Sequence, residues 1–204
     1  MRITGGRARG IRLVFQPGKL RPTTDALREA LFSALGRAVE GASFADLFAG
    51  TGSYGLEAIS RGARRGDFVE NRADAVAAIR DNLGRVAKSA GVGEAAYAVH
   101  RADAFRWNRP GCRPDLIFFD PPYALLRSAP SPCARLLGDW ASAMGPAALL
   151  VLELPLGLDF SPPAPLRCLQ IVGSGNGQGS PRALILGRED ESQKSPLAIR
   201  GSKN

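Results

Sequence analysis

The sequence DLFAGTGSYG, residues 46–55, decides the fold. A short apolar run at 43–48 leads into it and a segment with helical spacing at 55–61 follows, so it predicts a strand, a glycine-rich turn and a helix. Glycines at such a turn let the backbone approach a ligand closely. In open parallel sheets, ligands bind where the strands end. The stretch therefore indicates an α/β domain that holds a nucleotide-like cofactor at this turn.

Strand and helix patterns alternate on both sides of this turn. The predicted strands cover 43–48, 66–70, 96–101, 115–119, 147–153, 166–172 and 183–186. The predicted helices cover 25–36, 55–61 and 131–143, with one more marked by Val76, Ile79, Leu83 and Val86. The last two strands have no helical pattern between them and are expected to pair antiparallel. The fold class is therefore α/β: a Rossmann-like, mostly parallel sheet with helices on both faces and a C-terminal antiparallel strand pair.

The composition is that of a globular protein with a basic excess. The chain has 204 residues, 45% of them hydrophobic, and a formal net charge of +8, which favours a polyanionic partner. Residues 1–21 are rich in glycine and hold six basic residues and no acid, and they are expected to form a hairpin or arm. The polar residues 188–204 are expected to form a disordered tail. The α/β domain is then expected at 22–187.

Several other kinds of site and protein are not expected. The N-terminus MRITGGRARG lacks the apolar stretch of a signal peptide, and AALLVL at 147–152 is too short to span a membrane. Cys112, Cys133 and Cys168 are widely spaced and His100 is the only histidine, so no metal site is predicted. We therefore expect a cytoplasmic protein with no membrane partner, whose reduced thiols pack in the core.

Three acidic residues follow or end three successive predicted strands. Asp46 lies in an apolar strand just before Gly50 and Gly52; it would repel a pyrophosphate but attract the ammonium and sulfonium groups of S-adenosylmethionine. Glu70 could accept hydrogen bonds from both ribose hydroxyls, and Asp103 from the adenine amine. Together they predict S-adenosylmethionine as the cofactor.

A second motif, Asp120-Pro121-Pro122-Tyr123, follows the predicted strand at 115–119. Two prolines hold the backbone extended and remove two donors. The Asp120 carboxylate and the Pro121 carbonyl can then grip the hydrogens of an aromatic amine, whose lone pair is otherwise delocalised. Tyr123 can stack on a base pulled out of a helix. We interpret these four residues as the catalytic motif of a methyltransferase that acts on an exocyclic amine.

The chain resembles the bacterial family of small-subunit (16S) rRNA guanine-N2 methyltransferases. The resemblance lies in ITGGRARGIRL, LRPTTDALREALF, DLFAGTGSYGLEAISRGA, FVE with a later DNL, and DLIFFDPPY, which together span roughly residues 2–123. RPTTDALREALF joined to DLFAGTG is the most specific part. The C-terminal third departs from the family, which usually has a Tyr-Gly pair near its last strands and often a His after the acid that ends the fifth strand. Here the sequence reads LELPLG and then GSGNGQGSPRALIL.

The resemblance implies a methyltransferase domain at 22–187 that modifies the N2 amine of a guanine in 16S rRNA or the small ribosomal subunit. It implies a cofactor site made of Asp46, Gly50, Gly52, Glu70 and Asp103. It also implies that the loop 21–25 lies near the cofactor, which adds Thr23 and Thr24. The basic N-terminal segment is implied to grip rRNA, through Arg7, Arg9, Arg12 and Arg21.

Other functions stay open at this point. An adenine-N6 methyltransferase acting on DNA or RNA uses the same catalytic motif, although no further domain for recognising a DNA sequence is apparent. The three glycines at 50, 52 and 55 also match the fingerprint of an NAD-dependent oxidoreductase. A noncatalytic RNA-binding module that retained the fold is the third alternative.

Overall fold

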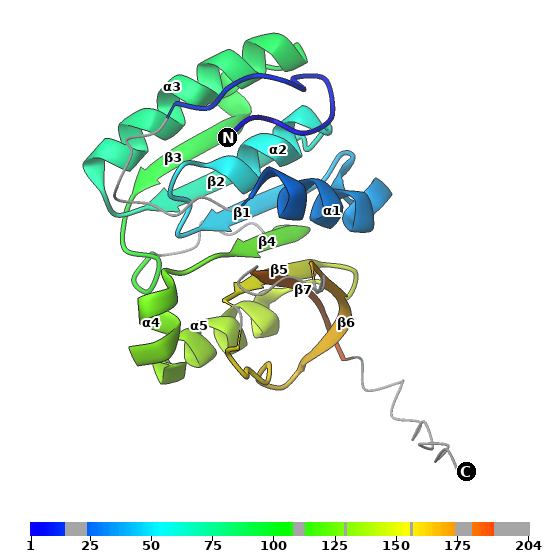
Figure 1. Cartoon of the computed structure of the whole chain (residues 1–204), viewed down its shortest axis with the longest axis vertical. Coiled ribbons are helices and arrows are strands. Elements are labelled where there is room, and N and C mark those ends of the chain that lie inside the picture. The colour runs from blue at the N-terminus through cyan, green and yellow to red at the C-terminus, as the bar shows by residue number, and fades with distance from the viewer. Residues whose placement is uncertain (15–23, 108–112, 129, 156, 174–180, 190–204) are drawn as a thin grey trace.

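The computed structural model describes residues 1–14, 24–107, 113–128, 130–155, 157–173 and 181–189. Within them, seven strands form one sheet in the order β3-β2-β1-β4-β5-β7-β6 (Figure 1). The strands are β1 (Ser43–Leu47), β2 (Arg65–Glu70), β3 (Tyr97–Arg101), β4 (Leu116–Phe119), β5 (Leu149–Leu154), β6 (Leu166–Val172) and β7 (Arg182–Arg188).

The pairing confirms the predicted fold class. Strands β1 to β5 pair parallel, whereas β7 pairs antiparallel with both β5 and β6. The strand order reverses between β1 and β4, since β2 and β3 lie on one side of β1 and the later strands on the other. A parallel sheet opens a crevice at such a reversal, beyond the carboxyl ends of the strands.

The helices cover both faces of the sheet. They are α1 (Asp25–Leu35), α2 (Ser53–Ser60), α3 (Ala73–Ala90), α4 (Tyr123–Ser128) and α5 (Pro130–Ala143), with short 3₁₀ turns at Gly36–Val39 and Glu94–Ala96. The apolar sides of α1, α2 and α3 pack on one face around Phe32, Phe44 and Phe68. On the other face α4 and α5 pack around Phe119 and Trp140. The two cores hold the strands rigidly, so the ends of the strands are fixed relative to one another.

The structure differs from the predictions at a few elements. Helix α4 was not predicted, because its six residues are too few to show a helical period. Residue Phe48, predicted as the last of its strand, has a φ of 58° and ends the pairing at Leu47. Of the cysteines, Cys133 packs in the core, but Cys168 is exposed on β6, so the prediction of a buried thiol is wrong there. Cys112 lies outside the described residues.

The N-terminal segment forms a hairpin-like turn that is packed on the domain. Arg2 and Arg12 form an antiparallel bridge, and Ile3, Ala8 and Leu13 are buried in the same core as α1 to α3. The Glu57 carboxylate of α2 accepts hydrogen bonds from the N–H and the hydroxyl of Thr4, both at 2.8 Å. The segment is therefore part of the domain's packing in the residues that the structure describes.

Buried charge ties this segment to two helices. The fully buried Arg28 of α1 pairs with Glu57 of α2 at 3.3 Å and with Asp25 at 2.8 Å, and it also donates to the carbonyl of Arg2. Arg61 pairs with the other Glu57 oxygen at 2.9 Å. Because every charge here has a partner, the desolvation cost of the buried pair is offset.

At the other end of the chain, Arg188 still belongs to β7, and Glu189 donates its N–H to the Pro165 carbonyl. The rest of the predicted tail, residues 190–204, lies outside the described residues. In the part that the structure covers, no helix has the length and apolarity to cross a membrane. The same residues contain no group of three or more histidine, cysteine or acidic side chains that could hold a metal.

Candidate active site

A cavity of about 370 Å³ opens at the carboxyl ends of β1, β2, β4 and β5 and beyond the end of β3, across the point where the strand order reverses. This volume lies in the range of small-molecule sites. Its polar side chains come from segments far apart in the sequence, and include Asp46, Glu70, Asp103, Asp120, Tyr123 and Glu153. The structure thus places at one cavity the acids predicted at the three strand ends and the whole Asp120–Tyr123 motif.

The three glycines of the turn between β1 and α2 occupy their positions for different structural reasons. Gly52 adopts a φ of 75°, caps α2 and donates its N–H to the Ala49 carbonyl at 2.7 Å. It does not line the cavity, although it was predicted to bind cofactor. A Cβ on Gly55 would lie 2.3 Å from the Phe68 ring, so no side chain fits there. Gly50 does line the cavity, and of these three glycines it is the one placed to face a ligand directly.

Glu70 is held at the end of β2 by backbone donors. One carboxylate oxygen accepts from the Gly50 N–H at 2.8 Å and the other from the Arg72 N–H at 2.9 Å. The side chain is buried yet lines the cavity. It therefore links the glycine-rich turn to the second strand, which sequence spacing alone does not reveal.

Asp46 is the most buried acid of the cavity. It is 1% exposed, and one oxygen accepts from the Gly55 N–H at 2.9 Å. Burial raises the pKa of Asp46 to about 8; the Gly55 hydrogen bond opposes this shift and the nearby Glu70 carboxylate adds to it. A carboxyl group with such a pKa is mostly neutral at neutral pH, and a cation placed beside it favours the ionised form and lowers its pKa.

The other three predicted cofactor contacts differ in placement. Asp103 is half-exposed in the turn after β3, where it accepts from the Phe105 N–H at 3.0 Å, and it lines the cavity. Thr24 caps α1 by accepting from the Leu27 N–H at 3.2 Å and is not among the residues that line the cavity. Thr23 lies outside the described residues.

The Asp120–Tyr123 motif turns directly from β4 into α4. The Pro122 carbonyl accepts from the Leu125 N–H at 2.8 Å, so the second proline serves as the start of this short helix. Asp120, Pro121, Pro122 and Tyr123 all line the cavity. The Tyr123 hydroxyl donates to Glu153 at 2.7 Å, and the Tyr54 hydroxyl donates to the other oxygen of Glu153 at 2.5 Å.

Glu153 is the one acid of the cavity that the sequence analysis missed. It is 3% exposed near the end of β5. An acid within the apolar run LLVLEL was the available signal, since an unpaired carboxylate is rarely buried in a strand. Its two partners lie 99 and 30 residues away in the chain, which no local pattern indicates.

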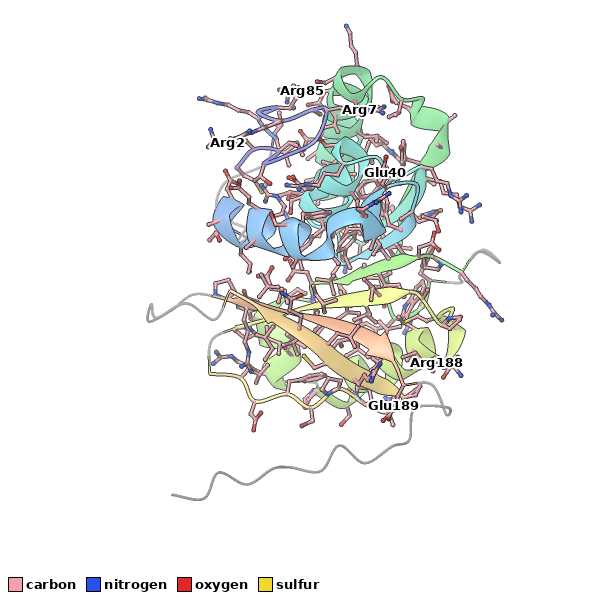
Figure 2. The ribbon with its side chains drawn as sticks, turned by 90° about the vertical axis from the view of Figure 1, so that its right-hand side faces the viewer. Arg2, Arg7, Glu40, Arg85, Arg188 and Glu189 are labelled. Atoms are coloured by element: carbon pink, nitrogen blue, oxygen red, sulfur yellow. The ribbon has the colours of Figure 1, made fainter. Side chains whose placement is uncertain are left out.

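Of the predicted RNA-binding arginines, Arg7 lies at the end of α2 that is remote from the cavity. Arg7, Arg9 and Arg12 are exposed, but the Arg7 N–H donates to the Ser60 carbonyl at the last residue of α2. In Figure 1 the arrowheads of β1 to β3 lie to the left, whereas the loop of the N-terminal segment extends to the right. Figure 2 looks onto that right-hand side and labels Arg2 and Arg7 there. Arg21 lies outside the described residues.

Comparison with known proteins finds a family and several relatives to which this chain is similar. Residues 1–159 match the family described as Conserved hypothetical protein 95. Over 128 residues the chain is 36% identical to the "Putative rRNA methyltransferase YlbH" of Bacillus subtilis, covering 60% of this chain and 67% of the relative. Over 125 residues it is 36% identical to "Ribosomal RNA small subunit methyltransferase D" of Escherichia coli K12, covering 60% of each. The match thus spans about three fifths of the Escherichia coli relative.

Solved structures match over more of the chain. The "Putative methyltransferase yhhF from Escherichia coli" superposes with a TM-score of 0.73 at 30% identity, covering 93% of this chain and 98% of that one. A hypothetical protein of Thermus thermophilus superposes with a TM-score of 0.66 at 30% identity, covering 93% and 99%. At 93% of the chain, these matches extend beyond residues 1–159 of the family match.

Proposed function

We propose, since the chain belongs to the Conserved hypothetical protein 95 family and is similar to proteins named as rRNA methyltransferases, that it methylates the N2 amine of a guanine in 16S rRNA, with S-adenosylmethionine as the donor. One observation carries the proposal. Asp46, Glu70 and Asp103, from the ends of three strands, line the same cavity as the Asp120–Tyr123 motif. This arrangement supports the transfer of a methyl group from a cationic nucleoside to an aromatic amine. The proposed location is the cytoplasm, where rRNA is found.

The residues fit such a cofactor. A buried carboxylate at Asp46 complements a cationic methionine moiety. Glu70 is fixed by two backbone donors, so it is oriented in advance to accept from ribose hydroxyls. Asp103, half-exposed at the rim, is placed for the adenine amine. When bound, S-adenosylmethionine supplies a methyl group on a positively charged sulfur.

The Asp120–Tyr123 motif then acts on the base. Asp120 and the Pro121 carbonyl accept hydrogen bonds from the guanine amine, so its nitrogen lone pair is directed at the methyl carbon. The new N–C bond forms as the methyl–sulfur bond breaks, and the extra proton of the methylated amine leaves to Asp120 or water. Tyr123 offers its ring as a stacking surface for the base. Most of the rate enhancement comes from positioning the two reactants in one site.

The proposal is tested by transfer of a tritiated methyl group. Small-subunit particles and free 16S rRNA from cells that lack the enzyme are incubated with the protein and labelled S-adenosylmethionine, and the RNA is digested to nucleosides. We expect the label in N2-methylguanosine. Label in N6-methyladenosine would favour the adenine-N6 alternative, and saturable NAD binding without any methyl transfer would favour an oxidoreductase.

A further inference from the structure

The carboxylate of Glu153 joins three elements of the site. It accepts from the Tyr54 hydroxyl of α2 at 2.5 Å and from the Tyr123 hydroxyl of α4 at 2.7 Å, while its own backbone belongs to β5. These elements come from both faces of the sheet. All three residues line the cavity. A hydrogen bond from a phenol to a charged carboxylate is short and strong, so this bridge restricts both rings.

The Tyr54 end of the bridge is anchored in the core. Tyr54 is 3% exposed, and its ring stacks on Phe118 with centroids 5.3 Å apart and planes 6° apart. Tyr123 is half-buried and begins the six-residue helix α4. Core packing therefore fixes the Tyr54 ring, and the Tyr54 hydroxyl fixes the Glu153 carboxylate. That carboxylate in turn accepts the hydrogen bond that restrains the Tyr123 hydroxyl.

The strand register places this tether beside the catalytic motif. Leu152 pairs with Phe119, so Glu153 lies at the level of Asp120 on the neighbouring strand. A tether at this point fixes the Tyr123 ring relative to the Asp120 carboxylate. The base must meet both groups at once, and an error in the position of either one lowers the rate of transfer.

We propose that Glu153 is a positioning residue, which acts through the Tyr123 hydroxyl to hold the stacking ring over the site where the base is methylated. This inference rests on the proposed function, because it takes the ring to contact the base. It assigns to the Tyr123 hydroxyl a role distinct from stacking. The hydroxyl fixes the ring, and the ring receives the base.

A double-mutant cycle tests the proposal. Glu153→Leu, Tyr123→Phe and the double variant are compared with the wild-type protein for kcat and KM of labelled methyl transfer to rRNA, and for S-adenosylmethionine affinity by calorimetry. Each single change frees the same ring, so each should lower kcat about 10- to 100-fold, and the double variant should be no slower than the slower single variant. Cofactor affinity should stay at the wild-type level. Glu153→Gln, which keeps one acceptor oxygen, should recover part of kcat.

Tyr97→Phe is the matched control. It removes another buried phenol, whose hydroxyl donates to the Ala63 carbonyl at 2.7 Å, at the start of β3 and away from the cavity. It should lower thermal stability without changing kcat. Glu153→Leu also removes the hydrogen bond from the buried Tyr54 hydroxyl to Glu153, and if that variant does not fold, Tyr123→Phe and Glu153→Gln still form a cycle.

The possible outcomes distinguish the role of Glu153 from the proposed methyltransferase function. Additive losses in kcat, or a Tyr123→Phe variant that transfers methyl at the wild-type rate, would overturn the role of Glu153 while leaving the methyltransferase intact. Losses confined to stability, as in Tyr97→Phe, would do the same. If the wild-type protein itself transfers no methyl group to rRNA, the proposed function fails and the inference fails with it.

Discussion

At the residue scale, the protein environment and the proposed ligand favour opposite protonation states of Asp46. Burial favours the neutral carboxyl and raises its pKa to about 8, whereas a cationic ligand favours the carboxylate. The free protein therefore holds Asp46 mostly protonated at neutral pH. Binding of the cation must then release a proton, and cofactor affinity depends on pH.

We expect S-adenosylmethionine affinity to rise between pH 6 and 7.5, by up to about tenfold per pH unit, because the ionised fraction of Asp46 grows tenfold per unit below its pKa. Calorimetry in two buffers with different heats of ionisation should show proton release at pH 7. Asp46→Asn should bind more weakly and lose this dependence. A wild-type affinity that is flat over this range would mean that Asp46 does not meet the positive charge.

At the element scale, the packing of the N-terminal segment explains its basic and glycine-rich sequence only in part. Thr4 and Gly5 donate to Glu57, which Arg28 and Arg61 neutralise. Arginines of this region thus have two kinds of surroundings: Arg28 is fully buried in ion pairs, and those of the hairpin are exposed.

Arg28→Ala should destabilise the protein by about 3–5 kcal/mol, since it leaves the fully buried Glu57 without one of its charge partners. Urea unfolding followed by circular dichroism gives the free energy of unfolding. The control is Arg64→Ala, which breaks an exposed pair with Asp115 at 3.9 Å and should cost about 0–1 kcal/mol. Equal effects of the two changes would show that the buried network does not hold the segment.

The sequence predicted the elements whose apolar runs are long, and missed contacts made between distant residues. Strands β1 to β5 and the acids at 46, 70 and 103 follow from local pattern and spacing. Helix α4 is too short for a periodic signal, and its start depends on the Pro122 carbonyl. Glu153 has no motif of its own, because its role arises only when folding brings Tyr54 and Tyr123 to it. Gly52 matched a ligand fingerprint, yet its position serves the turn.

At the scale of the whole molecule, Arg7 at the loop of the N-terminal segment lies at the end of α2 remote from the cavity, whereas Met1 of the same segment contacts Thr51, which lines the cavity. An RNA that contacts both Arg7 and the cavity must extend along the side of the domain formed by α2 and the N-terminal segment. Phosphate contacts position an RNA, whereas contacts to the base specify it. The hairpin is therefore expected to affect affinity and not the choice of base.

Replacing Arg7, Arg9 and Arg12 together with Gln should weaken rRNA binding and leave both the methylated nucleoside and cofactor affinity unchanged. The slope of log affinity against log salt should fall in magnitude by about 0.7 for each single-strand phosphate that the variant no longer neutralises. Arg135→Gln with Arg188→Gln, two exposed positions on α5 and β7, is the comparison. An unchanged slope in the triple variant would remove the hairpin from the RNA interface.

The most direct test of the account is single-turnover methyl transfer by Asp120→Ala, because the account assigns Asp120 to the amine and not to the cofactor. We expect the rate to fall by about 100-fold or more, with S-adenosylmethionine affinity retained. Asp159→Ala, at an exposed acid that does not line the cavity, should transfer at the wild-type rate. Near-normal transfer by Asp120→Ala would contradict the account, since the motif would then be only a turn between β4 and α4.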